Sequence, residues 1–331
     1  MGGWSLGGRW RWGAPTICTM VTNPATDDPS AVDPPPDLSS GLPPDLPSGR
    51  PSDPTGGRRN LLADCQNCFA LCCVALPFAR SADFAIDKKG GTPCPNLAPD
   101  FRCGIHNRLR PTGFVGCTVY DCFGAGQQVS QVTFGAADWR SSPTIATQMF
   151  EVFPVMRDLH ELLWYLRESL ELRSAVQLHP ALKNAVRDTE RLTDSDPAVL
   201  LALDVDVHRR RVGALLVQVS ELVRAQAVGK EGSKHRTDLV GADLMGAKLA
   251  RADLRGADLR GAYLIGADLR RADLRLASLI GADLRAAELH GADLSSSLFL
   301  TQFQLNAAKG DGMTVVPDSL SRPAHWSTRS D

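Results

Sequence analysis

The sequence lacks any long apolar run, and its charges nearly cancel. No stretch of about 18 apolar residues occurs, so no membrane-spanning helix is predicted. Lysine and arginine total 36 against 37 aspartate and glutamate, which leaves no bulk charge to attract nucleic acid or an anionic membrane. Residues 1–20 hold no apolar segment typical of a secretory signal, so we expect a cytoplasmic protein.

Familiar catalytic patterns are also missing from the sequence. It contains no Walker loop, no Rossmann glycine pattern and no recognisable Ser-His-Asp spacing. The segment Phe123-Gly-Ala-Gly-Gln127 has too few glycines for a phosphate-binding loop, and no clear strand leads into it. We therefore interpret the protein as non-enzymatic, with a redox role for its cysteines left open.

Composition divides the chain into five segments. Residues 1–60 form a tail in which residues 21–60 carry ten prolines, and such a segment buries too little apolar area to offset its ordering entropy. We expect this tail to be disordered, and Met20 is as good a starting residue as Met1. The remaining segments are a cysteine-rich domain at residues 61–140 and a helical domain or spacer at residues 143–229. A repeat domain at residues 237–301 and a C-terminal cap and tail at residues 302–331 follow.

Helical periodicity marks the middle of the chain. An apolar stripe follows alternating steps of four and three residues, formed by Val152, Met156, Leu159, Leu163, Leu166 and Leu170. Pro154 is predicted to kink this helix or to begin it, Pro180 to begin a second helix, and Pro197 a third that runs to Val223. Three helices packed on a shared core are expected. The stripe could instead dock a protein partner or a second copy, so dimerisation is left open.

The repeat domain has a period of five residues. Read in fives from Thr237, leucine fills the third position of twelve pentads, from Leu239 to Leu294, and Phe299 fills that of the thirteenth. A five-residue period advances about 500° around an α-helix, so these leucines would form no stripe. A backbone that turns one corner per pentad points all of them toward one axis.

This segment resembles the pentapeptide-repeat family, whose motif is Ala-Asp/Asn-Leu-x-x. The resemblance implies a right-handed, four-sided β-helix with four pentads, about 20 residues, in each coil. Asp253, Asp273 and Asp293 should then stack in one column. Solenoid ends need covering. The helical domain is the expected N-terminal cap, and residues 302–326 are the expected C-terminal cap.

The best-known function of that family is interaction with DNA gyrase through mimicry of duplex DNA, which requires a long and strongly acidic rod. Residues 237–301 carry nine acidic and eight basic side chains, so gyrase interaction is only a second alternative. Arg255 and Arg275 should lie beside the aspartate column and pair with it. We interpret the repeats as a binding surface for a protein partner, with direct nucleic-acid binding not expected.

Eight of the nine cysteines lie close together in the sequence. A C-x2-C pair lets two thiolates bind one ion from a tight turn, and in a reducing compartment clustered cysteines indicate metal ligands before disulfides. A disulfide framework stays open if the protein is exported. The eight cysteines suffice for two metal sites of four ligands each, or for one site with spare cysteines, and His106 is a further candidate ligand. The eight are Cys65, Cys68, Cys72, Cys73, Cys94, Cys103, Cys117 and Cys122.

The cysteine-rich domain resembles the CxxCxxCC family of zinc- or iron-chelating proteins. The resemblance rests on the Cys72-Cys73 pair, the Pro93-Cys94 step and Arg110-Pro111 before Cys117. The spacing before the Cys pair departs from the family pattern, as do the five residues between Arg110-Pro111 and Cys117. The resemblance implies a zinc or iron–sulfur ligand set but no reaction. The predicted function is an adaptor with a metal-stapled domain, and the alternative is an iron–sulfur or thiol redox protein that docks through its repeats.

Overall fold

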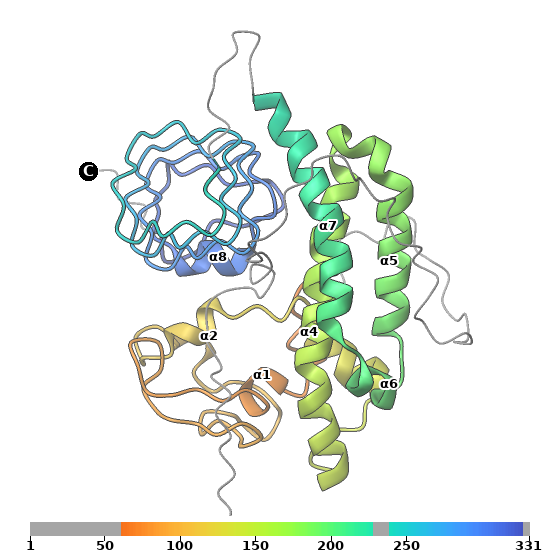
Figure 1. Ribbon diagram of the computed structural model, residues 1–331. Coiled ribbons are helices and arrows are strands. Elements are labelled where there is room, and N and C mark those ends of the chain that lie inside the picture. Colours follow the sequence, from red (N-terminus) through yellow and green to blue (C-terminus); the bar gives the residue numbers. More distant parts are fainter. Residues whose placement is uncertain (1–60, 228–237, 327–331) are drawn as a thin grey trace, which may run out of the picture.

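The computed structural model describes residues 61–227 and 238–326, which form a cysteine-rich unit, a layer of helices and a coiled repeat domain (Figure 1). The predicted disordered tail lies outside the described residues, as do residues 228–237 and 327–331. No helix in the described part of the chain is long and apolar enough to cross a membrane.

The cysteine-rich unit consists mostly of loops, as its glycine and proline content predicts. Its small core is built from Phe78, Phe84, Leu109 and Phe114. Two isolated antiparallel bridges join Phe78 to Lys88 and Leu97 to Cys103. Its helices are single turns or little more: α1 (Leu71–Val74), η3 (His106–Arg108), α2 (Val115–Val119), α3 (Ala125–Gln127) and η4 (Gln128–Thr133).

The helical layer contains α4 (Pro143–Glu171), η5 (Arg173–Leu178), α5 (His179–Thr193), α6 (Pro197–Ala202), α7 (Val205–Arg224) and η6 (Ala225–Ala227). Pro154 lies inside α4 and does not begin it, since the helix begins at Pro143. The N-cap residue Ser142 precedes it, and its side chain accepts a hydrogen bond from the Thr144 amide. The prediction of one helix from Pro197 to Val223 is wrong. Asp204 interrupts it, because its carboxylate accepts hydrogen bonds from the amides of Asp206 and Val207 and caps α7.

The repeat domain is a four-sided solenoid of parallel coils. Bridges join residues 20 positions apart and recur every five residues, and Asp253, Asp273 and Asp293 stack in one column as the period predicts. The leucines from Leu254 to Leu294 point inward and are at most 6% exposed. The first eleven pentads, from the one ending at Gly241 to the one ending at Gly291, end in the left-handed backbone region, which explains the frequent glycine there.

The segment after the repeats closes the last coil. Helix α8 (Gln302–Ala307) follows Thr301, and the coil continues through a bridge from Asp293 to Val315. The Trp326 indole is buried and donates a hydrogen bond to the Ala308 carbonyl at 3.0 Å. These residues lie where the sequence placed a C-terminal cap.

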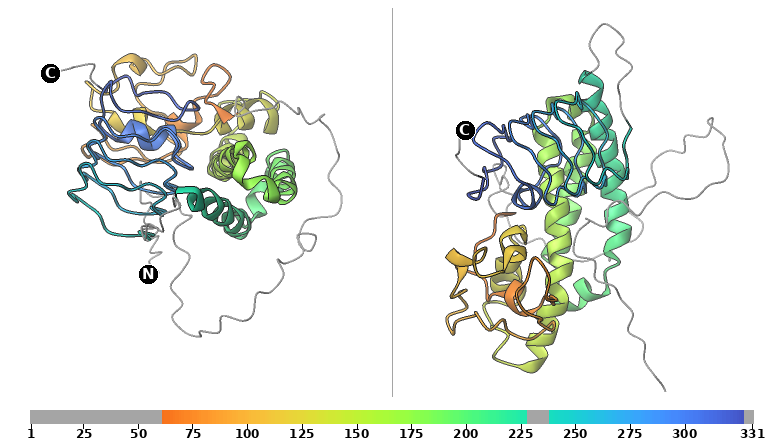
Figure 2. Two further views of the ribbon diagram at one scale, coloured as in Figure 1. Left: turned by 90° about the horizontal axis from the view of Figure 1, so that it is seen from above. Right: turned by 90° about the vertical axis from the view of Figure 1, so that its left-hand side faces the viewer.

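The helices lie along one side of the solenoid rather than across its first coil (Figure 2). Asp258, Ser278 and Leu298 form the covered side and are all buried. The Glu168 carboxylate accepts a hydrogen bond from the Phe299 amide at 2.7 Å, and helices and solenoid share one apolar core. The helical segment is therefore neither a free spacer nor the expected N-terminal cap. The reason is that the outward residue on this side changes from Asp258 to Ser278 to Leu298 in successive coils. The side becomes apolar, and the helices bury it.

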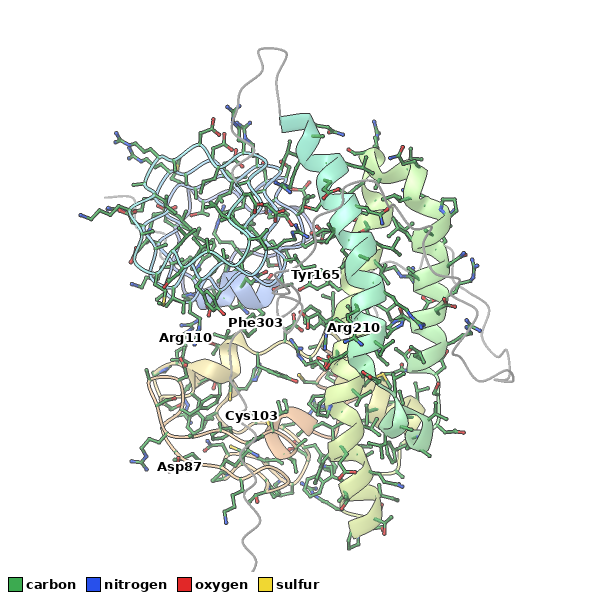
Figure 3. The ribbon with its side chains drawn as sticks, in the orientation of Figure 1. Asp87, Cys103, Arg110, Tyr165, Arg210 and Phe303 are labelled. Carbon is green, nitrogen blue, oxygen red and sulfur yellow. The ribbon has the colours of Figure 1, made fainter. Side chains whose placement is uncertain are left out.

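The cysteine-rich unit contacts the C-terminal end of the solenoid. Arg110 points toward α8 (Figure 3) and donates to the Asn306 carbonyl at 3.0 Å, while the Asn306 amide donates to the Thr118 carbonyl at 3.1 Å. The first half of α4 packs on the cysteine-rich unit and its second half on the solenoid. Helix α4 thus connects the two.

A buried histidine on α4 should make stability depend on pH. His160 donates from Nδ1 to the Phe123 carbonyl at 2.8 Å, and burial lowers its pKa from 6.5 to about 4. Below pH 6.5 the His160 imidazole is protonated in the unfolded chain, whereas in the folded chain it stays neutral down to about pH 4. The free energy of unfolding therefore falls as the pH falls from 6.5 toward 4. We expect His160 to account for a loss of about 2 kcal/mol between pH 7 and pH 5.

Urea unfolding of the native protein and of His160→Gln at both pH values measures this effect. The variant should lose less stability on acidification than the native protein, and the exposed His106→Gln should behave as native. An equal loss in the native protein and in His160→Gln would contradict the assignment.

Candidate metal centre

The eight cysteines singled out in the sequence lie in one unit and fall into two neighbouring groups. Most of the thiols influence others of the same group electrostatically, and two influences cross between the groups, from Cys73 on Cys65 and from Cys73 on Cys72. The first group, here called the proximal group because it packs against α4, contains Cys65, Cys68, Cys72 and Cys122. The second, here called the distal group, contains Cys73, Cys94, Cys103 and Cys117.

The two groups meet on helix α1. It carries Cys72 and Cys73 as successive residues, and their sulfur atoms contact each other at 3.9 Å. The Cys94 amide donates to the Cys73 carbonyl at 3.0 Å, which holds the Pro93–Pro95 loop against α1. Cys103 follows on the bridge to Leu97, and Cys117 lies on α2.

Gly126 makes room for the proximal group. A Cβ atom at this position would lie 2.6 Å from the Cys68 sulfur and 3.9 Å from the Cys122 sulfur. The Ala125 amide donates to the Cys122 carbonyl at 2.9 Å, so the turn that brings Cys122 into place also brings Gly126. The glycine here lets the Cys68 side chain approach the backbone closely.

Burial disfavours the charged form of most of these thiols. It raises the pKa of Cys68 to about 11 and that of Cys117 to about 12, and it also raises the pKa of Cys65, Cys103 and Cys122. Without a cation these thiols stay protonated at neutral pH. Thiols of this kind are poor nucleophiles, whereas a bound metal ion would deprotonate them.

A buried lysine lies beside the distal group. Lys88 is 6% exposed, and its ammonium donates to the carbonyls of Val74, Lys89 and Thr92 at 2.9, 3.2 and 2.9 Å. Among residues 61–227 and 238–326 it forms no ion pair with a carboxylate. The groups that would favour its charge are thiolates, with Cys94 and Cys73 acting most strongly. Sequence reasoning missed Lys88, since Lys88-Lys89 resembles an ordinary surface pair.

The thiols do not meet at a single point. Within the described ranges, no three His, Cys, Asp or Glu side chains are placed closely enough together to hold one ion. His106, the spare candidate, is exposed on η3. The donor chemistry nevertheless fits a thiophilic metal, because each group offers four sulfur atoms and the distal group has a buried cation beside it.

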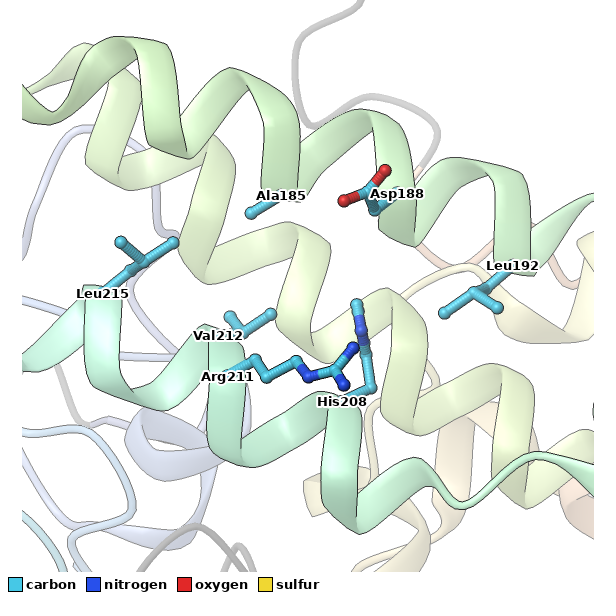
Figure 4. Close-up of a pocket in the computed structure, with 7 residues that line it drawn as sticks. All are labelled: Ala185, Asp188, Leu192, His208, Arg211, Val212 and Leu215. Carbon is cyan, nitrogen blue, oxygen red and sulfur yellow. The ribbon is translucent and has the colours of Figure 1, made fainter. Parts of the chain in front are cut away.

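A small cavity between α5 and α7 offers no competing site (Figure 4). Its volume is about 40 Å³, room for a few water molecules at most. Asp188, His208 and Arg211 line it together with aliphatic side chains. The Nε2 atom of His208 already lies 2.8 Å from the Thr189 hydroxyl, so this histidine is part of the helix packing.

The four-sided coil with one inward leucine per pentad defines the class of protein. The family model for pentapeptide repeats matches residues 235–264 and 262–299. The "Uncharacterized protein YybG" of Bacillus subtilis (strain 168) is 59% identical over 267 residues, which are 81% of this chain and 95% of that protein. The chain therefore belongs to the pentapeptide-repeat proteins.

A solved structure is also similar, a pentapeptide-repeat protein from the thylakoid lumen of Arabidopsis thaliana. It is 29% identical and covers 30% of this chain and 68% of its own chain. The TM-score is 0.14, which is too low to support any argument from the superposition.

Proposed function

We propose that this protein is a metal-binding interaction scaffold, in which the cysteine-rich unit holds a thiophilic metal and the solenoid presents a binding surface. The observation that carries the proposal is the buried Lys88 ammonium, which has thiols and no carboxylate around it. A buried positive charge is costly unless an anion accompanies it. Thiolates held on a metal are that anion.

Each cysteine group supplies the donors for one centre. Four thiolates around a divalent ion leave a net charge of about −2, which a nearby ammonium would partly neutralise. The bound metal would also tie α1, the Cys94 loop and α2 together. A metal site of this kind suits a unit whose separate apolar cluster has four buried side chains, since small domains bury too little apolar area to be stable alone.

The solenoid surface supports a scaffold role better than mimicry of DNA. Arg270 and Arg275 pair with Asp268 and Asp273 at 2.7 and 2.5 Å, and Arg275 also reaches Asp293 on the next coil at 3.5 Å. These pairs neutralise the aspartate columns. A surface of alternating charge can recognise a protein partner but cannot imitate closely spaced phosphates.

Metal analysis and an ultraviolet–visible spectrum of anaerobically purified protein test the proposal. We expect about two zinc ions per chain and no visible colour if each group binds one ion. A brown protein absorbing near ~400 nm would support the iron–sulfur redox alternative. Protein that carries no metal and takes up none on reconstitution would overturn the metal proposal.

Two matched variants test whether the Lys88 ammonium stabilises bound metal. Lys88→Met should lower metal retention against a chelator by about tenfold, because the distal group loses its neighbouring cation. Lys89→Met removes the exposed neighbour and should leave retention unchanged. Equal retention in the two variants would show that Lys88 does not serve the centre.

A further inference from the structure

The first coil of the solenoid is open at its end. Leu239, Leu244 and Leu249 are only partly buried, whereas every later leucine of the stack is enclosed. Val240 and Met245 on the same coil are 45% and 57% exposed. Apolar side chains thus gather at one end of the solenoid, within the residues described.

Backbone amides and carbonyls of this first coil that face the open end have no hydrogen-bond partner on another coil within the described residues. In later coils the second-position amide donates to the coil before, as Tyr263 does to the Ala242 carbonyl at 2.9 Å and Asp268 to the Ala247 carbonyl at 2.9 Å. Asp243, Lys248 and Asp253 occupy that position on the first coil, and no earlier coil exists in the described chain. The end is therefore a closed ring of sheet edges, which other strands can extend.

We propose that this end docks against the same end of a second copy of the chain. A second copy supplies a ring of the same outline, with the same corner spacing and the same unpaired amides and carbonyls. The helical layer lies beside the first coil and not over it, so it leaves the end accessible (Figure 2). Two identical ends meet through a two-fold axis, in which each contact occurs twice.

Charge selects one register for this contact. On the outer face of the solenoid, Arg255 lies 3.7 Å from Asp273 on the next coil and pairs with Asp253 on its own coil at 2.6 Å. Under a two-fold axis the facing strands are antiparallel, so the second position of a pentad lies opposite the fourth. If the Asp253 side meets its own copy, each Asp253 lies opposite the partner's Arg255, and the intercoil ladder continues into the second chain.

The same register brings the apolar side chains together. Asp243 bridges to Tyr263, so Met245 and Tyr263 lie on neighbouring coils of the side opposite Asp253. In the proposed dimer, that side of one chain also faces the same side of the second chain. The Met245 side chains of both chains then lie together at the contact. Ion pairs on one side and apolar side chains on the other give an interface with a defined orientation.

Sedimentation velocity of the full chain over a range of concentrations tests the proposal. We expect a dimer whose Kd rises about tenfold or more in Asp253→Arg, where two like charges face each other across the axis. The double variant Asp253→Arg with Arg255→Asp restores the opposite charges and should restore the dimer. Met245→Glu should weaken the dimer as well, because it places a charge in the apolar contact.

Two matched controls separate this surface from general effects. Asp268→Arg makes the same change on the second coil, and Met313→Glu changes a methionine that is 76% exposed in the C-terminal segment. Both should leave the Kd unchanged, and circular dichroism confirms that each variant is folded. A native protein that is monomeric at about 100 μM, or a dimer that Asp253→Arg and Met245→Glu leave intact, overturns the proposal.

Discussion

A protein carrying Cys72→Ser and Cys73→Ser together is expected to lose most of its bound metal. The two residues are adjacent, yet each belongs to a different group, so the double change removes one thiol from each of the two proposed centres. Serine keeps the size of the side chain but is a weak ligand for a thiophilic ion. The cysteine-rich unit should then unfold, because its own apolar core is small.

The unfolding should spread into α4 but stop before the solenoid. Cys68, Cys72 and Cys122 pack on the core that includes the first half of α4, whereas the solenoid shares its core with the second half. Elemental analysis measures the metal, and limited proteolysis followed by mass spectrometry locates the unfolded segments. Cleavage should appear in residues 61–142 and the start of α4, with residues 238–326 intact.

Cys18→Ser is the matched control for this change. Cys18 is the ninth cysteine and is not among the eight that the proposal assigns as ligands, so its replacement should leave the metal content and the proteolysis pattern as in the native protein. Metal content that stays unchanged in the Cys72→Ser, Cys73→Ser protein would remove the basis of the ligand assignment.

The solenoid could be predicted from the sequence in detail, and the reason is its period. Once leucine recurs every five residues, the 20-residue coil follows, and with it the column of Asp253, Asp273 and Asp293. Local repetition carries this information because each coil contacts only its neighbours. The side that the helices cover also left a signal, since its outward positions change from Asp258 to Ser278 to Leu298 and lose their charge.

The division of the cysteines into two groups could not be predicted. It depends on the loops that return from Cys94, Cys103 and Cys117 to α1 over long stretches without periodicity. Lys88 was hidden for a similar reason, because nothing in its neighbourhood distinguishes a buried ammonium from a surface one. Long-range loop packing of this kind has no local pattern in the sequence.

Replacing Arg224 by leucine is expected to lower the free energy of unfolding by about 3 kcal/mol. Arg224 lies at the end of α7 and is 5% exposed; it donates to the Gly256 carbonyl at 2.8 Å and to the Asp258 carboxylate at 2.7 Å. Asp258 is itself 4% exposed, so Arg224→Leu leaves a buried carboxylate with Arg260 as its remaining ion-pair partner. The contact between helices and solenoid should loosen as a result.

Arg270→Leu is the control for the loss of stability expected in Arg224→Leu. Arg270 forms the same kind of pair with Asp268 at 2.7 Å, but on the open side of the solenoid where water screens both charges, so its loss should lower the free energy of unfolding far less than the loss of Arg224. Urea unfolding of the two variants and the native protein measures the difference. Adding Asp258→Asn to Arg224→Leu should recover part of the loss, since the buried charge is then gone. Equal costs at Arg224 and Arg270 would mean that the helices do not depend on this pair to hold the solenoid, and that the shared apolar core alone keeps them together.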